Sequence, residues 1–106
     1  MINVEAVKNE NQQIIKIKVS GHSGYDDLGK DIVCSAVSTA MYVSLGLLEK
    51  FNSDYKFTSD ESKPIMVLEV YKNDELSNAV LDNLVDTLKG IALDYQDFLK
   101  IDEIRR

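Results

Sequence analysis

The sequence is poor in three residue types, with one cysteine, one histidine and one proline among 106 residues. A single cysteine excludes an internal disulfide, and a lone thiol is more typical of a reducing compartment than of a secreted protein. Basic residues are also scarce, because 12 lysines and arginines face 18 acidic residues, which gives a net charge of −6. Such a surface repels phosphates and anionic lipids, so we expect no direct nucleic-acid binding, whereas a basic protein would be attracted.

The sequence also lacks a segment typical of membrane insertion. The first residues, Met1 to Glu5, show no charged region followed by an apolar one, so no signal peptide is expected. The most apolar run, residues 32–48, carries no charge, but it is shorter than a typical span and several small polar residues interrupt it. We therefore expect a buried helix, no membrane partner, and a cytoplasmic protein folded as one domain over residues 1–106.

Hydrophobic periodicity predicts seven elements. Strands are expected at residues 2–7, 14–20, near 55–57, at 65–71 and 98–104, with helices from 31 to about 51 and from 73 or 74 to about 95. Turn-forming residues 9–11 between the first two strands favour a hairpin. The order β-β-α-β-β-α-β predicts an α/β (α+β) fold, a two-layer sandwich in which two helices cover a small mixed sheet. The first helix is apolar nearly all round, so we expect a second cover, which another subunit could provide.

The only cysteine, Cys34, is expected in the first turn of the first helix. Asp31 is a good N-cap there, which makes Cys34 the third helical residue. Unpaired amides and the helix dipole at this position favour negative charge, and the thiolate is the nucleophilic form of cysteine. The same amides could stabilise an oxyanion above the helix end.

The only histidine, His22, lies in a glycine-rich connection between Gly21 and Gly24. Such a connection could bring the imidazole within hydrogen-bond reach of the thiol, as a cysteine–histidine pair requires. Structural alternatives remain open at this point, because a lone cysteine among apolar residues is usually a small buried side chain and a lone histidine in a loop is usually solvated. One histidine and one cysteine without CxxC or HxxxH spacing do not predict a metal site, and no cofactor is expected.

The order of residues 21–38 adds a more specific signal. Gly21-His22-Ser23-Gly24-Tyr25, three residues, and then Gly29-Lys30-Asp31-Ile32-Val33-Cys34-Ser35-Ala36-Val37-Ser38 resemble the motif of the ribosomal-processing cysteine proteases. In that family the pattern is G-H-x-G-Y, three residues, G-x-D-I-V-C, a small residue and A-V-S. This chain has Ser35 where the family most often has alanine, a change that adds one hydroxyl beside the expected nucleophile.

The resemblance implies a function and site residues. Cys34 would be the nucleophile, and His22 the general base that later protonates the leaving amine. Peptidases of this family remove an N-terminal extension from a protein of the large ribosomal subunit, a basic substrate that suits the acidic surface. The family also implies a homodimer packed largely through helices.

Secondary roles around this pair stay open. Asp31 could orient the imidazole or act only as the N-cap, which we favour. Ser38 lies one turn beyond Cys34 and could bond near the site or back to its own helix. Tyr25 could line a pocket or anchor the loop, and Gly21, Gly24 and Gly29 are expected hinge or close-approach residues in a loop that orders on substrate.

A second class of function competes with the peptidase. A non-catalytic module could hold the basic tail of a ribosomal protein with its acidic face, although this leaves the placement of Cys34 and His22 unexplained. An inert thiol in alkylation at neutral pH would favour that module. A thiol redox sensor is a weaker alternative, because no second cysteine can resolve an oxidised sulfur within the chain.

Overall fold

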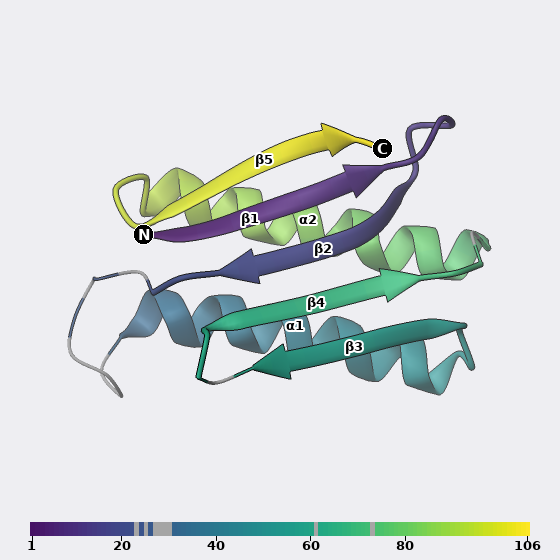
Figure 1. Ribbon diagram of the computed structural model, residues 1–106, viewed down its shortest axis with the longest axis horizontal. Coiled ribbons are helices and arrows are strands. Elements are labelled where there is room, and N and C mark those ends of the chain that lie inside the picture. The colour runs from purple at the N-terminus through teal and green to yellow at the C-terminus, as the bar shows by residue number, and fades with distance from the viewer. Residues whose placement is uncertain (23, 25, 27–30, 61, 73) are drawn as a thin grey trace.

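The computed structural model describes residues 1–22, 24, 26, 31–60, 62–72 and 74–106. The predicted order of elements and the predicted fold class are confirmed. The elements are β1 (Ile2–Lys8), β2 (Ile14–Ser20), α1 (Ile32–Lys50), β3 (Tyr55–Asp60), β4 (Ile65–Val70), α2 (Glu75–Asp94) and β5 (Leu99–Arg105) (Figure 1).

The strands form one sheet in the order β3-β4-β2-β1-β5. All neighbours are antiparallel except β1 and β5, which pair in parallel from Ile2–Leu99 to Lys8–Arg105. The sheet is therefore mixed, as predicted. The β1–β2 hairpin has the expected turn, because the Asn9 side chain accepts hydrogen bonds from the amides of Asn11 and Gln13 at 2.9 and 3.0 Å.

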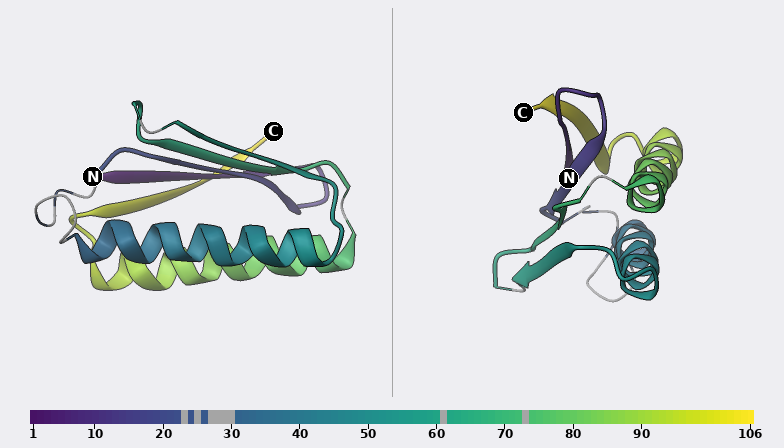
Figure 2. Two further views of the ribbon diagram at one scale, coloured as in Figure 1. Left: turned by 90° about the horizontal axis from the view of Figure 1, so that it is seen from below. Right: turned by 90° about the vertical axis from the view of Figure 1, so that its right-hand side faces the viewer.

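Both helices cover the same face of the sheet and run in opposite directions (Figure 2). The hydrophobic core lies between the two layers. On the sheet side it contains fully buried residues from the central strands, such as Ala6, Ile17 and Leu68, and on the helix side Val37 and Leu84. The other face of the sheet carries the charged side chains that alternate with these residues, as expected for a sheet that is covered on one side.

α1 buries a single stripe against the core, formed by Val33, Val37, Met41, Ser44 and Leu48. α2 lies beside it, and Tyr42 packs edge-on against Phe57 of β3 with 5.9 Å between ring centroids. Ile32 and Val43 remain 50% and 59% exposed, so apolar surface stays uncovered on the outer side of the helix.

By length and composition α1 could cross a membrane, a test that core helices of soluble proteins also pass. Its buried stripe identifies it as a core helix in this fold.

Glu103 connects three elements at the β5 edge. Its carboxylate oxygens lie 3.0 Å from Lys8 Nζ of β1 and 2.6 Å from Lys89 Nζ of α2. The hydrogen bond from Lys89, followed by that from Lys8, lowers the pKa of the Glu103 carboxyl. Because the folded-state pKa is lowered, this carboxylate stabilises the fold above its ordinary pKa and stops doing so as the pH falls through the folded value.

Glu103→Gln should therefore destabilise the protein at pH 7, by no more than about 1 kcal/mol because exposed ion pairs are screened by solvent. The difference from wild type should shrink at pH 3. Urea unfolding at the two pH values measures both effects, with Asp102→Asn as the control, because its 4.0 Å contact with Lys100 is weaker. An equal loss at both pH values would contradict an electrostatic role for Glu103.

Candidate active site

The Asp31 side chain defines the start of α1. Its backbone is extended, with φ −78° and ψ 99°, and its Oδ1 accepts hydrogen bonds from the amides of Val33 and Cys34, both at 3.0 Å. The residue is only 7% exposed. These bonds satisfy two of the donors that every helix N-terminus leaves unpaired, so the predicted N-cap is confirmed.

Cys34 is consequently the third residue of α1. Its side chain is half-buried and packs against the edge of the hydrophobic core, and the thiol is free of any disulfide. The cap holds the Cys34 amide directly, so the position of this cysteine depends on the bond from its own backbone to Asp31.

The end of β2 positions His22. Gly21 has φ +90°, and a Cβ built on it would lie 2.5 Å from the Met1 carbonyl oxygen, so only glycine fits this close approach. The Gly21 amide also donates to the Pro64 carbonyl oxygen at 2.9 Å. These contacts are the close approach that we expected as one of two roles for Gly21. His22, the next residue, is exposed.

The two residues line one pocket of about 490 Å³ at the N-terminal end of α1. Its described lining consists of His22, Gly24, Asp26, Asp31, Cys34, Ser35 and Ser38. The pocket thus unites His22 and Cys34 with Asp31 and Ser38, and Gly24 at φ +73° forms part of its wall. Two other predicted residues, Tyr25 and Gly29, lie outside the described residues.

Asp26 is a pocket residue that sequence reasoning missed. The connection around Asp26 has no hydrophobic periodicity, so the sequence does not predict which of its side chains face a pocket. Asp26 adds a second carboxylate to the lining that contains Asp31. Ser35 was noted only as a departure from a motif, yet its side chain also lines the pocket.

The structure corrects one expectation about this helix end. We expected the amides of the first turn to be available for an oxyanion. The amides of Val33 and Cys34 instead donate to Asp31, because an aspartate at the N-cap consumes the donors that the helix leaves unpaired. An oxyanion in this pocket would need other donors, or a movement of the Asp31 side chain.

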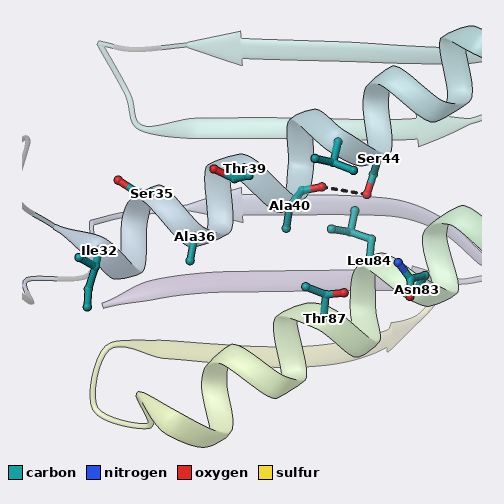
Figure 3. Close-up of a pocket in the computed structure, with 10 residues that line it drawn as sticks. Ile32, Ser35, Ala36, Thr39, Ala40, Ser44, Asn83, Leu84 and Thr87 are labelled. Carbon is teal, nitrogen blue, oxygen red and sulfur yellow. Dashed lines mark hydrogen bonds between the residues drawn. The ribbon is translucent and has the colours of Figure 1, made fainter.

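A second hollow of about 500 Å³ lies between α1 and α2 (Figure 3). Small residues of α1, including Ala36 and Ala40, face Asn83 and Thr87 of α2 across it. Ser35 belongs to the lining of both hollows, so they meet at this residue. The described lining of the second hollow contains no cysteine, histidine or acidic side chain, whereas the pocket of Cys34 and His22 has the groups needed for acyl transfer.

Metal binding finds no support in the described part of the chain. No group of three or more histidine, cysteine, aspartate or glutamate side chains is placed to hold an ion there.

Comparisons with known proteins give the same picture at the level of the family. The model of the family described as cysteine protease Prp matches residues 1–100. The ribosomal processing cysteine proteases Prp of two Staphylococcus aureus strains, Mu50 and NCTC 8325, are each 20% identical to this chain over 103 residues. In both cases the match covers 95% of this chain and 97% of the relative.

Solved structures share the fold. A crystal structure of the S. aureus ribosomal processing protease Prp with a covalently linked product peptide superposes with a TM-score of 0.92 at 18% identity, covering 97% of this chain and 99% of that one. A Streptococcus mutans protein gives a TM-score of 0.88 at 21% identity, covering 100% of this chain and 96% of that one.

Substitution of Asp31 separates its two possible roles. If Asp31 acts as the cap, Asp31→Ala should lose about 1 kcal/mol of stability, whereas Asp31→Asn should stay close to wild type, because asparagine caps equally well. Urea unfolding measures this, and the rate of Cys34 alkylation by iodoacetamide reports on the pocket. An asparagine variant that is stable but alkylates at a different rate would show that the charge of Asp31 also acts on the Cys34–His22 pair.

Proposed function

The chain belongs to the cysteine protease Prp family, and on this basis we propose that it removes the N-terminal extension of a large-subunit ribosomal protein, with Cys34 as nucleophile and His22 as general base. The protein is a cysteine protease by family. The finer assignment is supported above all by the pocket that the sole histidine and the sole cysteine of the chain share. The names of the S. aureus relatives and the net charge of −6, which suits a basic substrate, support the substrate class.

In the proposed first step His22 takes the thiol proton of Cys34, and the sulfur attacks the carbonyl carbon of the scissile peptide bond. The resulting tetrahedral intermediate collapses as His22 donates its proton to the leaving amine, which breaks the carbon–nitrogen bond and leaves an acyl-enzyme. A water molecule, deprotonated by His22, then attacks the thioester. Cleavage of the carbon–sulfur bond releases the new carboxylate and restores the thiol.

Asp31 and Asp26 line the same pocket as His22 and Cys34. We assign Asp31 a role in orienting the His22 imidazole in addition to its cap, and we assign Ser38, whose half-buried side chain also lines the pocket, a hydrogen bond to the reacting carbonyl group.

We also propose that residues 1–106 form one peptidase domain and that the protein acts in the cytoplasm as a homodimer. The dimer is supported by the outer side of α1, where Ile32, Val43 and Leu47 expose apolar surface and no charged residue lies between 32 and 48. A second copy can approach this side without repulsion between like charges, despite the net negative charge of the chain.

Cleavage of the host's own extended ribosomal protein tests the proposed chemistry. We expect wild type to cut at one site, whereas Cys34→Ala, Cys34→Ser and His22→Ala should lose cleavage by at least about a thousandfold while remaining folded, because each removes a member of a unit that acts together. Gel analysis with mass spectrometry of the products measures this. Retained cleavage in Cys34→Ala would refute the mechanism, and binding without cleavage by wild type would favour the non-catalytic module.

Light scattering tests the dimer. Wild type should have twice the 11.9 kDa mass of the chain, and Val43→Glu should have the mass of one chain, because a charge buried in an apolar interface is costly. Tyr71→Glu is the matched control, because Tyr71 is comparably exposed, at 55%, but lies after β4 and outside the helix layer. A wild type of 11.9 kDa at micromolar concentration would refute the dimer.

A further inference from the structure

The backbone that leads into His22 is held by the beginning of β4. The Gly21 amide donates to the Pro64 carbonyl oxygen at 2.9 Å, which extends the β2–β4 ladder one step beyond the Ser20–Ile65 pair. On another side the Gly21 Cα packs close to the Met1 carbonyl. The direction in which the chain leaves Gly21, and with it the place of the His22 imidazole, therefore depends on where Pro64 presents its carbonyl oxygen.

The position of Pro64 is set in turn by the connection between β3 and β4. One carboxylate oxygen of Asp60, Oδ1, accepts three hydrogen bonds: from the Ser62 amide at 3.0 Å, the Ser62 hydroxyl at 2.7 Å and the Lys63 amide at 3.3 Å. The Ser62 hydroxyl first, and the Lys63 amide second, lower the pKa of the Asp60 carboxyl, so the acceptor is ionised at neutral pH. Proline has a fixed φ and restricts Lys63 to extended conformations, which leaves the connection few alternatives once Asp60 holds it.

The last residue of β3 lies in one row with residues of two neighbouring strands. Asp60 of β3 pairs with Ile65 of β4, which pairs with Ser20 of β2. The end of β3 and the start of β4 lie at the same end of the sheet as the end of β2 (Figure 1). A displacement of the connection would therefore act directly on Gly21 and on the residue that follows it.

We propose that Asp60 is a positioning residue for His22, acting through the β3–β4 connection and the Pro64 carbonyl that holds Gly21. Asp60 touches no substrate in this account. This inference rests on the proposed function of His22 as the general base. Its effect is expected on the chemical step more than on substrate binding, because a small misplacement of a catalytic group slows the reaction of substrate that is already bound.

The test compares Asp60 with a second capping aspartate. Asp60→Ala should lower kcat roughly three- to tenfold with little change in KM. The reason is that cleavage slows when the His22 imidazole is displaced by about one ångström or less. Asp60→Asn should restore kcat, since the amide oxygen accepts the same bonds, and Ser62→Ala should give a smaller loss. Asp74→Ala is the matched control, because the Asp74 Oδ1 accepts the Ser77 amide at 2.7 Å as the N-cap of α2, which follows the other end of β4.

A spectroscopic measurement separates positioning from loss of stability. The chain has one histidine, so its NMR spectrum contains a single imidazole Cε1–H signal. The chemical shift of this signal should change in Asp60→Ala and return in Asp60→Asn, while Asp74→Ala leaves it at the wild-type value.

The outcomes distinguish this inference from the proposed function. If wild type does not cleave, or if His22→Ala cleaves normally, the proposed function fails. If wild type cleaves and His22→Ala does not, but Asp60→Ala matches Asp74→Ala in kcat and in the imidazole signal, the positioning role of Asp60 is refuted. A loss of kcat in Asp60→Ala that Asp60→Asn does not reverse would also refute it, because the role requires only an acceptor.

Discussion

The hydrogen bonds from the amides of Val33 and Cys34 to the Asp31 carboxylate are the interaction on which the site depends. They end the connection from β2, begin α1 and fix the backbone of the cysteine in one step. Because α1 is also pinned to the sheet by its buried stripe, the start of the helix cannot shift along its axis without exposing core residues such as Val33 and Val37. The cap and the core therefore determine the location of the Cys34 sulfur together.

The histidine is fixed by the other layer. β2 is a central strand, paired with β1 on one side and β4 on the other, so its end is among the most constrained parts of the sheet. His22 follows that end by two residues and lines a pocket with a side chain from the helix layer. The candidate dyad, Cys34 and His22, thus lies at one end of the sandwich. The helix layer supplies the cysteine, and the end of a sheet strand positions the histidine.

Much of this arrangement could be predicted from the sequence. Alternation in residues 14–20, helical spacing from 76 to 95 and the capping aspartate at 31 led to the correct elements, because each pattern reflects burial on one face or a local bond. β3 was predicted only near residues 55–57, because its remaining residues are polar and exposed, and form a strand only through pairing with β4.

Other features of the site could not be predicted from the sequence. The position of Asp26 in the pocket lining and the hydrogen bond from Gly21 to Pro64 depend on the course of the chain in space, which no local pattern encodes. The oxyanion expectation was wrong for the amides of Val33 and Cys34, because it counted them as free donors although the predicted cap uses both.

The parallel pairing of β1 with β5 has a consequence for synthesis of the protein. Residue 2 pairs with residue 99, so one edge of β1 has no partner until the chain has been synthesised through β5. The hairpin of β1 and β2 can form early, but the row of backbone donors and acceptors on the far side of β1 stays open, and such an edge invites pairing with other nascent chains. Long-range closure of this kind also slows folding, because the entropy of a large loop is lost before the contact forms. The newly made chain therefore completes this sheet only once β5 has been synthesised, and β5 distinguishes a nascent form with an open β1 edge from the folded form in which that edge is paired.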